Sequence, residues 1–187
     1  MKKQVSRYLG FMLFPLVALL VMLQENEDDF IDWHQDRKLV WADFKGTPET
    51  GLDRAALSSI KITADFSFRN TVFSWKIYCR FNRKKSWGKV KTAYILQHEQ
   101  AHFDITEIHA RRLHQRLSEY SFNPKTYQKD IQGLYNRTIK EENEMQSLYD
   151  RETHHSIEKE KQEAWLKKVE KMLQETTPYA GYHSGSE

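Results

Sequence analysis

The sequence predicts an α+β fold, in which a small antiparallel sheet is followed by packed helices. Two long stretches alternate apolar and polar residues with period two, which is typical of half-buried strands. After about Ser86 the apolar residues recur at helical spacing, and three helical segments follow. The chain contains no internal repeat and no sign of a second folded domain.

The sheet is expected from three segments. Residues 38–44 predict a short strand, which ends where Gly46 and Pro48 interrupt the pattern. Residues 60–68 and 73–81 predict two longer antiparallel strands, because their apolar side chains alternate strictly with polar ones. Asn70 lies between them at the expected hairpin turn.

The helical part begins with a predicted helix over residues 91–117. Asn123 and Pro124 predict the start of a second helix, as its N-cap and its first helical residue. A break is expected near residues 153–155, where polar side chains interrupt the pattern. Ser156 is then a candidate N-cap for the last helix.

The N-terminus predicts export. Residues 1–7 are basic, residues 8–23 are apolar, and acidic residues follow at once, which orients the rest of the chain out of the cytoplasm. No small-x-small cleavage site follows the apolar run, and the run is shorter than the ~20 residues that span a bilayer comfortably. Residues 1–24 are therefore a signal peptide or an N-terminal membrane anchor. The expected location is periplasmic or extracellular, with attachment to the inner membrane if the segment stays uncleaved.

The remaining boundaries follow from composition. Residues 25–37 are expected to form an acidic linker, residues 38–176 the folded domain, and residues 177–187 a disordered tail. Lys2, Lys3 and Arg7 account for the net charge of +3, so the exported part is neutral and no field attracts nucleic acid. The lone Cys79 excludes an intramolecular disulfide framework. Nothing in the sequence indicates an oligomeric state.

One motif carries chemistry: His98-Glu99-Gln100-Ala101-His102, an HExxH sequence inside the first predicted helix. Positions i and i+4 share a helix face, so His98 and His102 can bind one zinc ion, Zn²⁺. Glu99 can then act as the general base for a water on the metal. The apolar residues around the motif indicate a helix packed into a core, where a buried imidazole needs a polar partner or a metal.

A catalytic zinc usually has three protein ligands and one water, so a third ligand is needed. Glu107 lies on the opposite face of the helix, and His109 lies ~10 Å along it from the motif. Ile105 and Ile108 occupy the glycine and histidine positions of the extended HExxHxxGxxH pattern. The remaining source is the segment 149–155, where carboxylates, histidines and a phenol gather at a helix break.

These segments carry a resemblance. LVWADFKG (39–46), FNRKKSW (81–87), HEQAHFDITE (98–107) and YDRETHH (149–155) occur in this order. Together they resemble a bacterial family of exported zinc-dependent metallopeptidases, filed as domain of unknown function 922. The resemblance extends from about Val40 to Trp165. It implies a zincin-like peptidase with His155 and Asp150 in its site, and it implies no particular substrate.

We predict that His155 is the third ligand, because a loop at a helix break can direct a side chain toward the motif. His154 and Glu152 are the alternatives. Asp150 is predicted to accept a hydrogen bond from the other ring nitrogen of a ligand imidazole. Tyr149 is predicted to stabilise the tetrahedral oxyanion of hydrolysis.

These assignments predict a zinc-dependent hydrolase, and in particular an endopeptidase acting on peptides or proteins outside the cytoplasm. A peptidoglycan cross-link fits the same chemistry. An edge strand of the sheet can hold an extended peptide by backbone pairing. The alternative is a non-catalytic exported module that binds zinc or a partner. A structural zinc site would need a fourth protein ligand, for which His154 is available.

Overall fold

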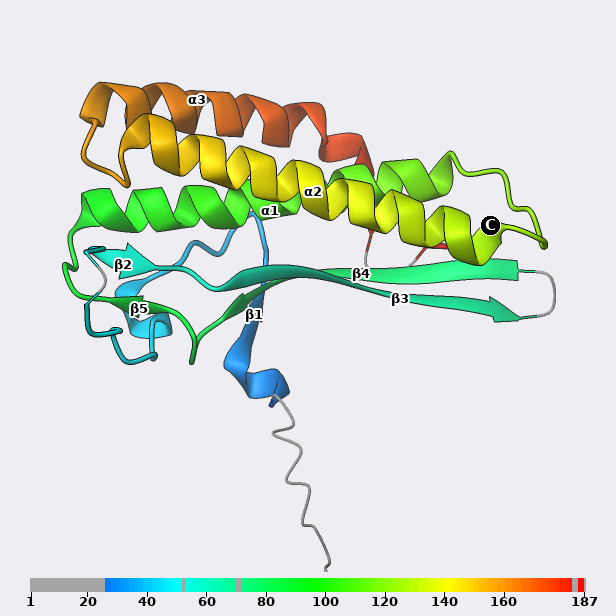
Figure 1. Ribbon diagram of the computed structural model, residues 1–187, viewed down its shortest axis with the longest axis horizontal. Helices are drawn as coiled ribbons and strands as arrows, with labels where there is room; N and C mark the ends of the chain where they lie inside the picture. The colour runs from blue at the N-terminus through cyan, green and yellow to red at the C-terminus, as the bar shows by residue number, and fades with distance from the viewer. Residues whose placement is uncertain (1–25, 52, 70–71, 183–184, 187) are drawn as a thin grey trace, which may run out of the picture.

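The computed structural model describes residues 26–51, 53–69, 72–182 and 185–186. The predicted α+β class is confirmed, with a small antiparallel sheet and three α-helices on one of its sides (Figure 1). The helices are α1 (Ala93–Ser118), α2 (Tyr127–Thr153) and α3 (Lys159–Glu175). The predicted signal peptide or anchor at residues 1–24 lies outside the described residues. Within them, no helix has the length and apolar character needed to cross a membrane.

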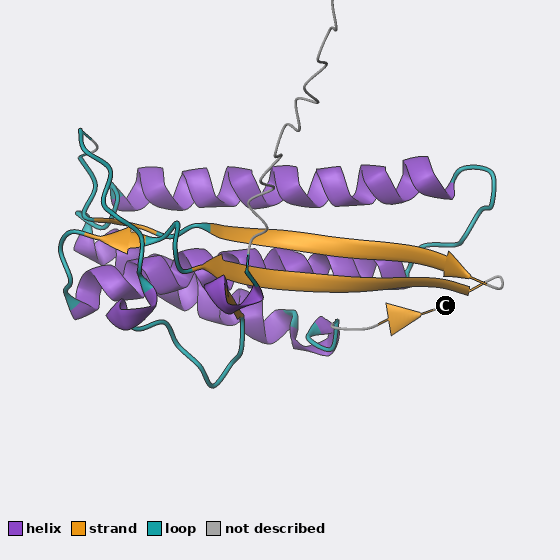
Figure 2. Cartoon of the chain, turned by 90° about the horizontal axis from the view of Figure 1, so that it is seen from below, coloured by secondary structure: helices purple, strands orange, loops and turns teal. Residues whose placement is uncertain are grey.

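The sheet is built around a long hairpin of β3 (Ile60–Arg69) and β4 (Val72–Asn82). Their register pairs Ile60 with Phe81 and Arg69 with Val72, as the alternating pattern predicts. Every second side chain of β4 is buried against the helices. The opposite face of the sheet carries the polar residues, and none of the three α-helices covers it (Figure 2).

Two further pairings extend this sheet at β4. β1 (Phe30–Asp32) pairs antiparallel with its C-terminal end, so part of the expected acidic linker is a strand. β6 (Gly185–Ser186) pairs with its N-terminal end. A separate two-stranded ladder joins β2 (Ala56–Leu57) to β5 (Trp87–Gly88). The strand expected over residues 38–44 is instead an extended segment with a 3₁₀ turn, Trp41–Asp43.

The C-terminal segment also differs from the expected disordered tail. A 3₁₀ turn, Thr177–Tyr179, follows α3, and Tyr182 is almost fully buried. The Tyr182 hydroxyl donates a 2.5 Å hydrogen bond to Glu107 Oε2 in the core. The composition is polar, but this single aromatic anchor holds the segment against α1, and composition alone does not reveal such an anchor.

Helix α1 is the centre of the molecule, because it packs on the sheet on one side and on α2 and α3 on the other. Thr92 caps its N-terminus, where Thr92 Oγ1 accepts a hydrogen bond from the amide of Ile95. One apolar cluster lies between α1 and the sheet, and a second lies between α1, α2 and α3. A helix enclosed on both sides holds its side chains in fixed positions.

The corner between α2 and α3 lies where the sequence predicts a break. Three consecutive non-glycine residues there, His154, His155 and Ser156, have positive φ angles of 47°, 51° and 75°. His154 ends α2 in the left-handed conformation, and its amide donates to the carbonyl of Arg151. The N-cap of α3 is Glu158 and not Ser156, because the left-handed turn delays the start of the helix. Likewise α2 begins at Tyr127, three residues after Pro124.

Candidate metal centre

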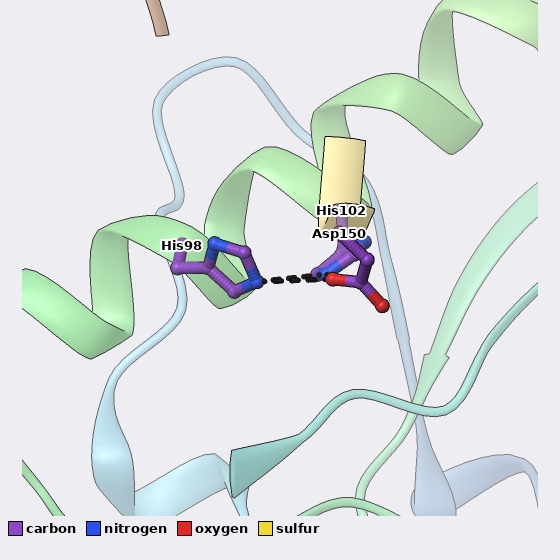
Figure 3. Close-up of side chains that lie close together, drawn as sticks. All are labelled: His98, His102 and Asp150. Carbon is purple, nitrogen blue, oxygen red and sulfur yellow. Dashed lines mark hydrogen bonds and ion pairs between the residues drawn. The ribbon is translucent and has the colours of Figure 1, made fainter. Parts of the chain in front are cut away.

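Three side chains from two helices meet in one group, which we call the metal group: His98 and His102 from α1 and Asp150 from α2 (Figure 3). The two imidazole Nε2 atoms are 3.2 Å apart. Asp150 Oδ1 lies 3.2 Å from Nε2 of His98 and 3.0 Å from Nε2 of His102. The three donor atoms therefore converge on one point between the helices.

The metal group fits a divalent ion in geometry and in chemistry. Zinc bonds of about 2.0–2.1 Å in a tetrahedral site hold the ligand atoms about 3.3–3.4 Å apart. The separations of 3.0–3.2 Å in the metal group are close to that edge length. Two imidazole nitrogens and one carboxylate oxygen are also a donor set that zinc accepts. Only three protein ligands converge among the described residues, so a fourth position is left for water or substrate.

Ionisation of the three groups differs. Burial would raise the pKa of the Asp150 carboxyl, but hydrogen bonds from His102 and His98 outweigh it and hold that pKa well below its usual value. Burial lowers the pKa of His98, which favours the neutral imidazole that a metal requires. Burial acts on His102 in the same direction, but its hydrogen bond to Asp150 and the nearby carboxylates raise its pKa. A metal ion therefore competes with a proton more strongly at His102 than at His98.

Gln146 orients the second histidine. Its side-chain oxygen lies 2.5 Å from His102 Nδ1, and its amide nitrogen donates to the backbone carbonyl of His102 at 2.9 Å. When Nδ1 carries the proton and donates to Gln146, the lone pair of Nε2 points at the metal position. The same amide nitrogen also donates to Glu142 and Thr106, so the rotamer of Gln146 is fixed.

Helices α1 and α2 are antiparallel here, and their polar residues form a ladder. His98, His102 and Thr106 follow each other at four-residue intervals on α1. Asp150, Gln146 and Glu142 do so on α2, and each faces its counterpart: His98 with Asp150, His102 with Gln146, and Thr106 with Glu142. Asp150 therefore lies opposite the HExxH motif, although it belongs to a helix and not to the loop after it.

Glu99 lines a cavity of about 340 Å³ together with the metal group. One wall of this cavity is the segment 54–60, which contains β2, and the other walls come from α1 and α2. In Figure 3, β2 runs below the three side chains. The Glu99 side chain is buried, and its Oε2 atom has no hydrogen-bond partner among the described residues. A buried carboxylate oxygen without a partner, beside an open ligand position, is placed to accept a proton.

The sequence-predicted ligand His155 lies next to the metal group and not within it. Its side chain is 47% exposed, and its Nδ1 lies 3.3 Å from Asp150 Oδ2, the oxygen turned away from the two histidines. His154 is exposed at the corner. Glu152 Oε2 accepts a hydrogen bond from Trp165 Nε1 at 2.7 Å, which turns it toward α3. The structure thus brings Asp150 together with His98 and His102, and it places His155 against Asp150, outside this group.

Tyr149 lies behind the metal group. Its ring stacks on His98 with centroids 4.5 Å apart, and its hydroxyl donates to the backbone carbonyl of His98 at 3.5 Å. The side chain is fully buried and is not part of the cavity lining. Burial also raises the pKa of the phenol well above its usual value. This placement favours a role in holding His98 over contact with a substrate oxyanion.

Glu107 and His109, which helix geometry excludes as metal ligands, are buried in the core. Glu107 is paired with Arg111, whose Nε lies 2.7 Å from Glu107 Oε1, on a side of α1 away from the metal group. His109 is fully buried, and burial lowers its pKa to about 4. Its Nδ1 donates to the carbonyl of Ile105 at 2.9 Å. The residues that sequence reasoning missed are Gln146 and the wall formed by 54–60; the four-residue spacing of Glu142, Gln146 and Asp150 was the available signal.

The fold and the metal group define an α+β protein with two histidines and one aspartate that could hold a metal ion. A family model described as bacterial protein of unknown function (DUF922) matches residues 34–156, and the chain belongs to this family. The matched range contains all three residues of the metal group. No curated protein and no solved structure matches the chain.

Proposed function

We propose that the protein is a zinc-dependent hydrolase of zincin type, and specifically an endopeptidase that acts outside the cytoplasm. The observation that carries the proposal is the convergence of His98, His102 and Asp150 on one point, beside Glu99, whose buried Oε2 has no partner among the described residues. A purely structural site has no use for an unpaired carboxylate next to an open ligand position. The export pattern of residues 1–24 supports the location, and a reporter fused after Glu187 that works only in the cytoplasm would refute it.

The chemistry divides among residues of this chain. A bound zinc ion supplies Lewis acidity, which polarises a carbonyl and makes water a nucleophile near neutral pH. Glu99 takes the proton of that water and returns it to the leaving amine. Gln146 keeps the proton of His102 on Nδ1, and Tyr149 holds the ring of His98.

His155 acts on Asp150. Because His155 Nδ1 approaches Oδ2, it holds the carboxylate so that only Oδ1 faces the two histidines. A carboxylate that binds through one oxygen leaves more room for water and substrate than one that binds through both. In this proposal Asp150 is the third ligand and His155 positions it, which exchanges the roles expected from the sequence.

The wall opposite the metal group suits an extended peptide. The carbonyl of Ala55 accepts hydrogen bonds from Lys89 and Val90, and the amide of Ser59 donates to Ser86 Oγ. By strand alternation, the residues between them, Ala56 and Ser58, direct their backbone groups to the other side, toward the cavity that they line. Ser58 Oγ is buried and lacks a hydrogen-bond partner in the described part of the chain. A peptide pairing with this edge would pass the metal group.

The alternative is a non-catalytic zinc-binding or partner-binding module. Glu99→Gln separates the two, because glutamine keeps the size of the side chain but cannot accept the proton. We expect the wild-type protein to contain close to one zinc and to cleave members of a broad peptide library. Glu99→Gln should keep its zinc and lose activity by about 10²–10⁴-fold. The solvent-exposed Glu144→Gln on α2 is the matched control. A zinc-loaded wild-type protein that cleaves nothing would favour the binding module.

A further inference from the structure

A second cavity adjoins the metal centre and carries arginines. It is lined by Arg54, Ser147, Asp150, Arg151, His154 and His155. Arg54, Asp150 and His155 also line the first cavity, so the two cavities share a wall beside the metal group. Arg54 begins the wall segment 54–60, two residues before β2, and Arg151 follows Asp150 on α2.

Arg54 and Arg151 have no counter-ion among the described residues. Neither guanidinium forms an ion pair or a hydrogen bond with the described residues, although many other arginines of the chain do. Arg37, Arg80, Arg111, Arg116 and Arg137 are each within 3.0 Å of a carboxylate oxygen. The one carboxylate in the second cavity, Asp150, is turned toward His98, His102 and His155. The positive charge of Arg54 and Arg151 is therefore not neutralised from within this cavity.

The direction of a bound peptide determines which part of it would lie next to Arg54 and Arg151. The β2 segment runs from Arg54 toward Ile60 along the cavity wall. A peptide paired antiparallel with this edge runs the other way, so its C-terminal part lies at Arg54. With the scissile bond at the metal group, this part is the leaving-group side. Guanidinium groups bind carboxylates through paired, charge-assisted hydrogen bonds.

We propose that Arg54 and Arg151 form a carboxylate-binding subsite beside the metal centre. The inference rests on the proposed hydrolase function and names its substrate class: peptides with a carboxylate close to the scissile bond on its C-terminal side. That carboxylate belongs to an acidic side chain or to the C-terminus of the peptide. Both sources present the same group to the arginines, and they are distinguishable by experiment.

The test uses one randomised peptide library in two forms, with a free-acid or an amidated C-terminus. The wild-type digest should be enriched about tenfold in products that carry Asp or Glu just after the cleaved bond, or in free-acid over amide peptides. Enrichment of Asp and Glu identifies the side chain, and free-acid selectivity identifies the terminus. The preferred peptide and its neutral partner are then measured for binding to zinc-loaded Glu99→Gln by fluorescence anisotropy.

Substitutions assign the preference to the two residues. In the Glu99→Gln background, Arg54→Gln and Arg151→Gln should each lower the affinity ratio between the acidic and the neutral peptide several-fold. Arg69→Gln, at the far end of β3, is the matched control and should keep the ratio. Both arginines are exposed, so the variants should fold, and unchanged thermal unfolding verifies this. Arg54→Lys should restore part of the ratio, because it restores the charge.

The outcomes separate this subsite from the proposed function. Cleavage of the library without any preference for a carboxylate would overturn the subsite and leave the hydrolase intact. A preference that persists in both arginine variants would do the same. If the zinc-loaded wild type cleaves nothing and Glu99→Gln binds no peptide, the hydrolase proposal fails and the subsite fails with it.

Discussion

Helix α1 carries two buried polar clusters, and they differ in how completely their atoms are paired. In the cluster of Glu107, Arg111 and Tyr182, both carboxylate oxygens accept hydrogen bonds from the other two residues. In the HExxH region, Glu99 Oε2 is buried without a partner among the described residues. A fully paired polar cluster stabilises a core, whereas Glu99 keeps an unpaired oxygen and lines the cavity beside the metal group. One helix therefore carries a polar cluster that is fully paired and another that keeps an unpaired acceptor beside a cavity.

The largest effect is expected when the two histidines of the metal group are removed. His98→Ala with His102→Ala should lose nearly all bound zinc, because two of three donors are gone. The measurement is metal analysis of the purified protein, and His34→Ala, on an exposed loop, is the control. Asp150→Ala should lose most of the zinc as well, while His155→Ala should weaken binding only ~10–100-fold. The reverse order for Asp150 and His155 would restore His155 as the ligand.

A substitution in the cluster of Glu107, Arg111 and Tyr182 should lower the free energy of unfolding. Glu107→Ala leaves the Arg111 guanidinium buried without its counter-ion, which should cost about 3–5 kcal/mol of unfolding free energy. Urea denaturation measures the loss, and the zinc content of the protein that remains folded should not change. A loss below about 1 kcal/mol would show that the cluster relaxes or admits water.

Gln146 offers a smaller test within the metal centre. Gln146→Ala removes the acceptor for His102 Nδ1 and should lower zinc affinity ~10–100-fold. Gln132→Ala is the matched control on the same helix, because the Gln132 amide donates to the exposed Asn136 and to no other described residue. Competition with a zinc chelator measures both variants. Equal affinities in the two would remove Gln146 from the site.

The smallest expected effect is the dependence of zinc affinity on pH. The raised pKa of His102 means that zinc must displace a proton as the pH falls through and below that pKa. Affinity should therefore decrease on acidification, by up to about tenfold per pH unit for one displaced proton. Calorimetry in buffers with different ionisation enthalpies counts the protons released. Zinc affinity that stays constant between pH 8 and 6 would contradict the assignment.

Much of this arrangement could be predicted from local pattern. Period-two alternation located the hairpin of β3 and β4, because β4 buries every second side chain, and helical spacing located α1 and α3. β1 and β6 were missed, since strands of two or three residues are held by their partner strand and leave almost no pattern of their own. The buried Tyr182 was missed because its contact lies 75 residues away in sequence.

The site was predictable to the extent that it is local. The HExxH spacing places both histidines on one helix face, which follows from helix geometry alone. The third residue depends on the register between α1 and α2, a tertiary property. His155 was favoured because a loop can direct a side chain freely, yet the antiparallel packing brings the helical Asp150 opposite His98. The four-residue spacing places Glu142, Gln146 and Asp150 on one face of α2. Which residues of α1 this face meets depends on how the two helices pack.

The left-handed corner at residues 154–156 has an energetic consequence. A helix that only needs to end commonly does so with glycine, which adopts positive φ without steric cost. This chain instead places two histidines and a serine there, at about 1–3 kcal/mol for each left-handed residue. The backbone conformation of this corner places His155 Nδ1 against Asp150 Oδ2. The folding free energy lost at the corner thus maintains this contact. His154→Gly would remove the steric cost of the positive φ and stabilise the turn. It would also make the turn more flexible, so that His155 would hold the Asp150 carboxylate less firmly.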